Sequence, residues 1–129
     1  MHEPIRQSVA VNASPERVYA ALTNSGEFTK MSDDTAAEIG TEAGSPFSCF
    51  AGMIEGRQVE LVQDERIVQA WRVRNWEAGV YSIATFQLTS ENGGTRIEFT
   101  HVGFPPEIRT HLESGWHENY WEPLKNYLE

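Results

Sequence analysis

The stretch RQVELVQDERIVQAWRVR, residues 57–74, decides the fold class. Branched and aromatic apolar residues are frequent in both of its halves, and the polar segment QDER lies between them. Two such runs joined by a short polar turn are typical of an antiparallel β-hairpin. We therefore predict strands at 57–62 and 67–74. The second strand alternates between an apolar face, which contains Trp71, and a basic face, which contains Arg72.

Further strands are predicted on both sides of this hairpin. A second hairpin follows it, because two alternating runs flank the turn sequence ENGG at 91–94. Near the amino terminus, residues 5–11 alternate between apolar and polar side chains, as a half-buried strand does. The remaining predicted strands are 35–39, 47–50, 82–88 and 95–102. Short turns separate most of them, so we expect an antiparallel sheet.

Helices are expected after the first strand and at the end of the chain. Ser14 can cap a helix that begins at Pro15, and the polar tripeptide NSG separates it from a short helix at 27–31. The last helix opens at Pro105, and its apolar side chains recur at spacings of four. Pro123 falls inside this pattern, so we expect a kinked or weakened helix there. The apolar positions are Ile108, Leu112, Trp116, Tyr120 and Leu124.

Composition narrows the class of protein. The chain has 129 residues, 40% hydrophobic and 22% charged, which fits a single domain spanning 1–129. Its formal net charge of −9 favours solubility or contact with a basic surface, and we expect no nucleic-acid partner. Cys49 is the only cysteine, and no stretch resembles a signal peptide or a membrane span. We therefore expect a cytoplasmic protein without an internal disulfide or a membrane partner.

In this order the elements resemble the START-like, or helix-grip, superfamily, an α+β fold whose curved antiparallel sheet wraps around a long C-terminal helix. Local motifs are similar to those of one family within it, the activators of the 90-kDa heat-shock-protein ATPase. The similarity is to their C-terminal domain and to stand-alone bacterial homologues, and it covers nearly the whole chain. The matching stretches are FSCF (47–50), ELV (60–62), RIVQAWR (66–72), NWEAG (75–79), GFP (103–105) and GWHENYW (115–121).

The resemblance implies two short helices after the first strand and a cavity between the sheet and the long helix. It also implies a possible heat-shock chaperone as partner. The eukaryotic members have an additional N-terminal domain that carries much of their chaperone docking. This sequence starts at the first strand of the helix-grip fold, so we expect that domain, and full co-chaperone activity, to be missing.

Few side chains suggest catalysis or metal binding. His111 and His117 are six residues apart, which places them about 120° apart around a helix, too far to share a metal ion. Cys49 has no adjacent base and fits a small buried hydrophobe. His101 lies on the apolar face of its strand, either as a hydrogen-bonded core histidine or as a polar anchor within a pocket. We expect no metal, no cofactor and no identifiable catalytic residue.

Aromatic side chains define the candidate binding site. Singly, each fits ordinary core packing, whereas as a set they fit the cavity that the resemblance implies. Buried Tyr120 and Trp116 would need hydrogen-bond partners, and their polar groups could orient a ligand. The predicted ligand-binding residues are Phe47, Trp71, Phe86, Phe99, His101, Leu112, Trp116 and Tyr120.

Three functions are compatible with these observations. The first is a non-enzymatic protein that binds a small apolar or aromatic molecule in a hydrophobic cavity. The second is a chaperone-interacting protein that acts through its outer surface. The third is an enzyme of the polyketide cyclase or aromatase kind, which shares the superfamily and would need His101 as an acid–base group.

Overall fold

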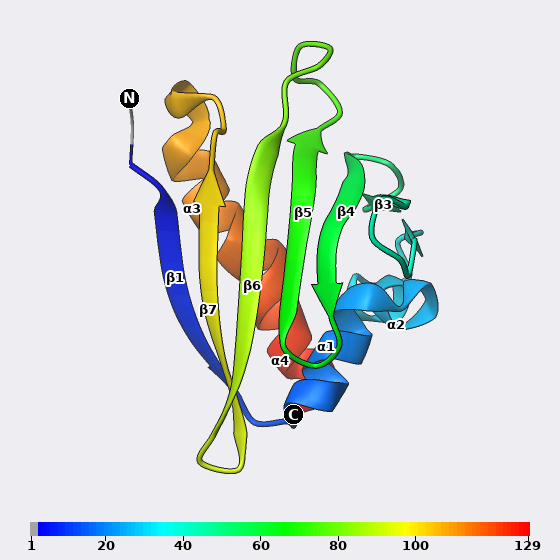
Figure 1. The fold of residues 1–129 in the computed structure, drawn as a ribbon, viewed down its shortest axis with the longest axis vertical. Helices are drawn as coiled ribbons and strands as arrows, with labels where there is room; N and C mark the ends of the chain where they lie inside the picture. Colours follow the sequence, from blue (N-terminus) through cyan, green and yellow to red (C-terminus); the bar gives the residue numbers. More distant parts are fainter. Residues whose placement is uncertain (1–2) are drawn as a thin grey trace.

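The computed structural model describes residues 3–129, which form a seven-stranded antiparallel sheet with helices packed on one face (Figure 1). The strand order is β1-β7-β6-β5-β4-β3-β2, so the first strand of the chain pairs with the last. The strands are β1 (Ile5–Val11), β2 (Glu38–Ile39), β3 (Pro46–Cys49), β4 (Ile54–Val62), β5 (Arg66–Val73), β6 (Ser82–Glu91) and β7 (Gly94–Val102). The predicted α+β architecture, a curved sheet around a long C-terminal helix, is confirmed.

Two helices, α1 (Pro15–Thr23) and α2 (Ser25–Met31), follow the first strand. The Ser14 hydroxyl accepts a hydrogen bond from the N–H of Arg17, as an N-cap does. The side chain of Asn24 caps α2 in the same way. Because Asn24 serves as the cap itself, a single residue separates the two helices, and the predicted three-residue break was too long.

In the β6–β7 hairpin the turn is shorter, and both strands are longer, than predicted. The predicted turn at 91–94 shrinks to Asn92 and Gly93, whose φ angles are 51° and 80°. Positive φ at both positions matches the right-handed twist of the two strands, and an Asn-Gly pair tolerates it best. The strands therefore continue to Glu91 on one side and begin at Gly94 on the other.

Strand β4 contains an irregularity that bends the strand. Its register shifts between Gln58 and Glu60, which leaves an extra residue that bends and twists the strand. A Cβ atom at Gly56 would lie 1.8 Å from the carbonyl oxygen of Ala70, so only glycine fits there. The strand also starts at Ile54, three residues before its predicted start, and the short predicted strand at 35–39 is reduced to β2.

The long C-terminal helix crosses the inner face of the sheet and changes its winding along the way (Figure 1). Its segments are the 3₁₀ turn η1 (Pro106–Ile108), α3 (Arg109–Trp116), the π-helical turn η2 (His117–Trp121) and α4 (Glu122–Leu128). Within η2 the N–H of Glu122 donates to the His117 carbonyl, five residues back. Pro123 lacks the N–H that an α-helical turn would use, and the widened turn lies directly before it.

The π-helical turn changes which side chains face the core. In a regular α-helix Trp121 would lie about 100° from Tyr120, outside the predicted apolar stripe. The wider turn brings Trp121 inward, so Trp116, Tyr120 and Trp121 are all buried. The stripe predicted from the sequence was therefore incomplete. No helix of residues 3–129 combines the length and the apolar character needed to cross a membrane.

Candidate functional site

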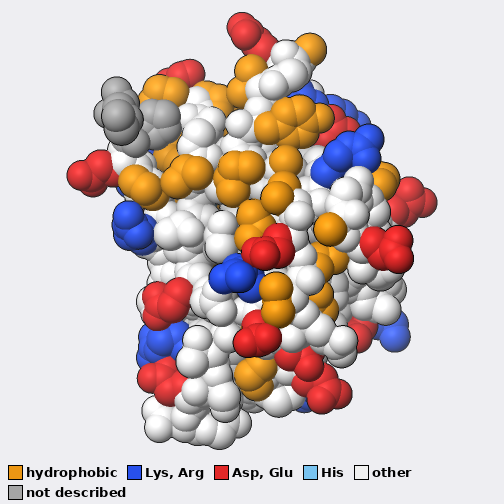
Figure 2. Space-filling view, in the orientation of Figure 1, with side chains coloured by type: hydrophobic (Ala, Val, Ile, Leu, Met, Phe, Trp, Pro, Cys, Tyr) orange, Lys and Arg blue, Asp and Glu red, His pale blue; other side chains and the backbone are white. Residues whose placement is uncertain are grey.

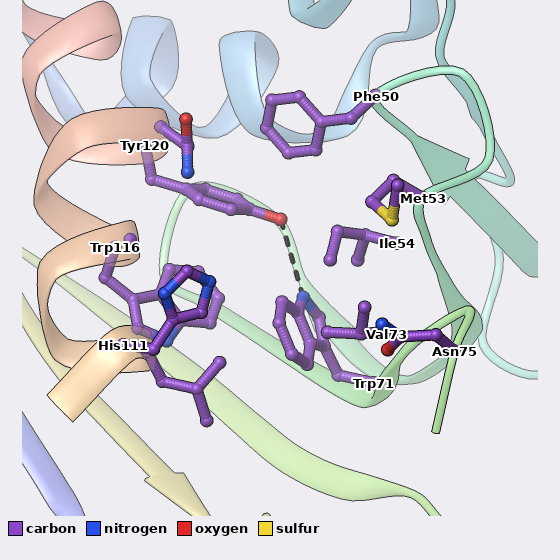
Figure 3. Close-up of a pocket in the computed structure, with 12 residues that line it drawn as sticks. Phe50, Met53, Ile54, Trp71, Val73, Asn75, His111, Trp116 and Tyr120 are labelled. Carbon is purple, nitrogen blue, oxygen red and sulfur yellow. Dashed lines mark hydrogen bonds between the residues drawn. The ribbon is translucent and has the colours of Figure 1, made fainter. Parts of the chain in front are cut away.

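A cleft of about 430 Å³ lies between the C-terminal helix and the adjoining ends of β4 and β5 (Figure 3). Strand β5 contributes Trp71 and Val73 to its walls, and the helix contributes Leu112, Trp116 and Tyr120. Small-molecule sites in proteins are commonly 300–1,000 Å³ and mostly apolar, and this cleft falls within that range. The remaining lining residues are Phe50, Met53, Ile54, Asn75, His111, Gly115 and Asn119.

The cleft brings together half of the residues predicted to bind a ligand. Trp71, Leu112, Trp116 and Tyr120 line it. The other predicted residues are buried and do not line it: Phe47, Phe86, Phe99 and His101. Of these, Phe99 and His101 lie behind the cleft wall, where both contact the Trp116 ring. The sheet interior is therefore filled with side chains, and the open space lies at one end.

Two cleft residues missed by the sequence analysis come from the turn between β3 and β4. Phe50 and Met53 close the cleft on the side opposite Trp116 (Figure 3). The turn places Phe50 and Ala51 at a φ of 55°, a left-handed conformation that costs about 1–2 kcal/mol for residues other than glycine. Nothing in the local sequence predicts that conformation, so the position of Phe50 could not be inferred from it.

The aromatic wall of the cleft is continuous. The ring centroids are 5.2 Å apart for Trp71 and Trp116, 4.3 Å for Trp116 and Tyr120, and 5.6 Å for Tyr120 and Phe50. The Trp71 indole donates a hydrogen bond to the Tyr120 hydroxyl, with 3.4 Å between the heavy atoms. Burial keeps the pKa of Tyr120 well above its usual range, so the hydroxyl keeps its proton and can donate it to a ligand.

His101 is held as a neutral core residue. The Trp116 indole donates to its Nδ1 at 3.1 Å, and because indole can only donate, the ring proton must be on Nε2. Nε2 then donates to Ser82 Oγ at 2.6 Å, and that hydroxyl donates to the Trp71 carbonyl. Burial lowers the pKa of His101 to about 3. Both nitrogens are occupied away from the cleft, so His101 is not placed to act as the acid–base group that a cyclase would need.

Two other functions considered for this chain, a cysteine nucleophile and a metal site, are not supported by the described residues. Cys49 is buried, and burial raises the pKa of its thiol to about 12, which disfavours the reactive thiolate. Within residues 3–129, no group of three or more His, Cys, Asp or Glu side chains is placed to hold a metal ion. The candidate site is a cleft with mostly apolar walls, and Asn75, His111 and Asn119 are the polar residues that line it.

Arg72 fixes the loop that borders this cleft. The guanidinium pairs with the Glu55 carboxylate and donates to the carbonyls of Trp76, at 2.6 Å, and Val80, at 3.3 Å. The sequence pattern predicted that Arg72 lies on the basic face of its strand, opposite Trp71. On that face the loop that Arg72 binds covers the side chain and buries it. That loop supplies Asn75 to the cleft rim, so Arg72 helps to set the shape of the opening.

Comparisons with known proteins agree with this architecture. The activator of 90 kDa heat shock protein ATPase homolog 2 from Mus musculus is 29% identical over 114 residues, which are 88% of this chain and 34% of the mouse protein. A crystal structure of an HSP90 activator from Plasmodium falciparum has a TM-score of 0.92 at 24% identity, covering 98% of this chain and 96% of that one. An X-ray structure of a Chromobacterium violaceum protein has a TM-score of 0.79 at 27% identity, covering 100% and 99%.

The structural likenesses confirm the fold, and the sequence likeness defines the family. The chain spans about a third of the length of its mouse and human relatives. The family model described as activator of Hsp90 ATPase homolog 1-like protein matches residues 12–129. That match covers nearly the whole sequence, as the resemblance of its motifs predicted. The chain therefore belongs to the family of activator of Hsp90 ATPase homolog 1-like proteins.

Proposed function

We propose that this protein binds a small apolar or aromatic molecule in the cleft, without catalysing a reaction. The observation that carries the proposal is the open space beside Trp71, Trp116 and Tyr120 at the end of an otherwise filled core. Aromatic walls with a few convergent polar groups suit an apolar ligand better than they suit water.

The cleft also indicates how such a ligand would be oriented. A ring could pack against Trp116 and Tyr120, whose aromatic surfaces favour offset or edge contacts. The Tyr120 proton has no acceptor among the hydrogen bonds of residues 3–129, so it is free to bond to a ligand carbonyl or hydroxyl. Asn75 and Asn119 supply further polar groups at the rim.

Gly115 supports the proposal because the fold does not require glycine at this position. It lies within α3, where glycine costs about 1 kcal/mol relative to alanine. The nearest atom to a Cβ added there is Nδ2 of Asn119, at an ordinary contact distance of 3.7 Å. A Cβ atom would therefore meet no close contact there, and because Gly115 lines the cleft, the missing side chain leaves that space open.

The test compares two leucine substitutions on the same helix. Gly115→Leu should fill the cleft, whereas Ser114→Leu adds the same side chain at an exposed position that does not line it. In a thermal-shift screen of lipids, flavonoids and other apolar metabolites, a ligand should raise the melting temperature of the wild type and of Ser114→Leu, but not of Gly115→Leu. Equal shifts in all three proteins would refute the cleft as the site.

A second candidate function is contact with an Hsp90-type chaperone in the cytoplasm. The mouse relative and the Plasmodium falciparum neighbour are named as activators of that chaperone. The outer face of the sheet also carries a band of apolar side chains (Figure 2). Within it Ile83 pairs with Val102 across β6 and β7, and Tyr81 lies nearby; all three are exposed. Exposed apolar patches of this kind are common at protein–protein contacts.

The chaperone candidate is tested with Hsp90 from the same organism. The wild-type protein should bind the chaperone and change its ATPase rate, and the double variant Ile83→Ser/Val102→Ser should do so less. Gly115→Leu serves as the control, because its substitution lies on the other face of the sheet. If both variants behave like the wild type, the outer band is not the contact surface.

A further inference from the structure

A second groove adjoins the cleft and extends it. This groove has a volume of about 710 Å³ and shares Val73, Asn75, His111 and Leu112 with the cleft. It lies between the loop after β5 and the start of the C-terminal helix, at η1. The two spaces therefore meet along these four residues.

The aromatic surface continues from one space to the other. Trp71 lines the cleft and Trp76 lines the groove. Their rings meet edge to face, with centroids 5.8 Å apart and an interplanar angle of 65°. Trp76 is also held in place through its backbone, because its carbonyl accepts a hydrogen bond from the buried Arg72 guanidinium. The boundary between the two spaces thus combines aromatic and aliphatic surface with the polar side chains of Asn75 and His111.

The two spaces differ in charge. The cleft is lined by no carboxylate, whereas Glu77 and Glu107 line the groove. Both glutamates are exposed, and neither forms an ion pair within residues 3–129. No lysine or arginine of this described part lines either space. The groove therefore presents two carboxylates without ion-pair partners in the described part of the chain, while the nearby Arg72 guanidinium is bound to the backbone carbonyls of Trp76 and Glu77.

We propose that the ligand is an amphiphilic amine, with its apolar ring in the cleft and its ammonium group in the groove beside Glu77 and Glu107. This inference rests on the proposed function of the cleft. An ammonium group is attracted both by carboxylates and by tryptophan rings, and both line the groove. A ligand with a carboxylate at the same end would meet like charge there.

Three probes that share a phenyl ring and a hexyl chain test the inference: phenylhexylamine, phenylhexanol and phenylhexanoic acid. Calorimetry at about pH 8 keeps the amine charged. The amine should bind about fivefold more tightly than the alcohol, and the acid should bind most weakly. The preference should shrink as salt is raised, since exposed charges are screened.

Variants assign the preference to the groove. Glu77→Gln/Glu107→Gln should bring the amine to the affinity of the alcohol, while Glu118→Gln, an exposed substitution outside both spaces, should leave the preference intact. If the alcohol binds and the amine binds no more tightly, the inference is overturned but the cleft remains a ligand site. A preference that survives in the double variant also overturns it. If none of the three probes binds, the inference and the proposed function fail together.

Discussion

His101 illustrates what sequence can and cannot tell about a single residue. Alternation along its strand placed the ring on the apolar face, and the structure shows it buried there. The choice between a core histidine and a pocket anchor depended on partners from other elements. Ser82 is on β6 and Trp116 is on α3, and no local pattern predicts that both would reach the ring. The two alternatives could therefore be separated only by the tertiary structure.

The buried neutral ring predicts a specific sensitivity to acid. The pKa of His101 is about 3 in the folded protein, and an unfolded histidine has a pKa of about 6.5. Between these values the unfolded state binds up to one more proton than the folded state. Lowering the pH through this range should therefore lower the free energy of unfolding, by up to about 1.4 kcal/mol per pH unit. Urea unfolding from pH 7 to pH 4 should show a shallower fall for His101→Gln. Parallel curves would contradict the assignment of a neutral ring.

Arg72 and Arg66 allow a second comparison of single residues. The Arg72 side chain is 9% exposed and binds loop carbonyls, whereas Arg66 is 42% exposed and pairs with Glu60 at the surface. Arg72→Ala should cost about 2–3 kcal/mol, because it removes a buried guanidinium and leaves partly buried loop carbonyls without its donors. Arg66→Ala should cost less than about 1 kcal/mol, as exposed ion pairs do. Chemical unfolding measures both.

Hydrogen exchange locates the effect of the Arg72 substitution. Amides at 76–80 should exchange faster in Arg72→Ala than in the wild type, because the loop loses the side chain that fixes it. Arg66→Ala is the matched control and should leave these amides unchanged. Similar stability losses for the two variants, without faster exchange in the loop, would rule out the positioning role of Arg72.

At the scale of elements, the C-terminal helix shows where a period-based prediction stops working. Spacings of four correctly placed Leu112, Trp116 and Tyr120 against the sheet. Pro123 correctly signalled a disturbance, but not its form. The π-helical turn adds one residue to the repeat and buries Trp121, whose indole donates to Gln7 at 2.7 Å. Helix periodicity cannot reveal such a change of winding, because it assumes a constant rotation per residue.

Substitutions at the two tryptophans separate core from cleft. Trp121→Ala should cost about 3–5 kcal/mol, since it leaves a closed cavity among Phe86 and Phe99. Trp116→Ala should cost less, because one side of that ring already borders the cleft, but it should abolish ligand binding. Urea unfolding and the thermal-shift assay measure both effects. A cost below about 0.5 kcal/mol for Trp121→Ala would place that residue on the surface.

At the scale of the whole molecule, the fold could be predicted because its signals are redundant. Alternating strands, Asn-Gly turn chemistry and the long apolar stripe all indicated the same architecture, and the motif order agreed with them. The cleft could be predicted only in part. Trp71, Trp116 and Tyr120 were found because they are large and in phase with their elements. Phe50 and Met53 were missed, because a left-handed turn rather than a periodic element places them.

The same redundancy leads us to expect folding without a metal ion or cofactor. The apolar residues form one buried core that connects the sheet with the helices on its inner face. Thermal melts recorded with and without a chelator should therefore coincide. A protein that depended on a structural metal would lose much of its stability when the chelator removed it. A large drop in melting temperature would show that the protein holds a structural metal ion.

The net charge of −9 gives a prediction for the response of the whole molecule to salt. Salt weakens ion pairs. The structure shows four of them within residues 3–129, and in every pair at least one of the two side chains is 38% or more exposed. Such pairs contribute at most about 1 kcal/mol each. Salt also screens the repulsion among the excess carboxylates, which acts over the whole surface and disfavours the compact state. Because the exposed pairs contribute little, we expect relief of repulsion to dominate.

Raising NaCl from about 20 mM to about 200 mM should therefore increase the free energy of unfolding, by on the order of 1 kcal/mol. Glu118→Lys/Glu122→Lys provides the matched comparison, because both side chains are exposed and neither belongs to an ion pair within the described residues. This variant lowers the net negative charge by four, so its stability at low salt should be higher and its salt dependence smaller. A wild-type protein that loses stability as salt is added would mean that its ion pairs outweigh its net repulsion.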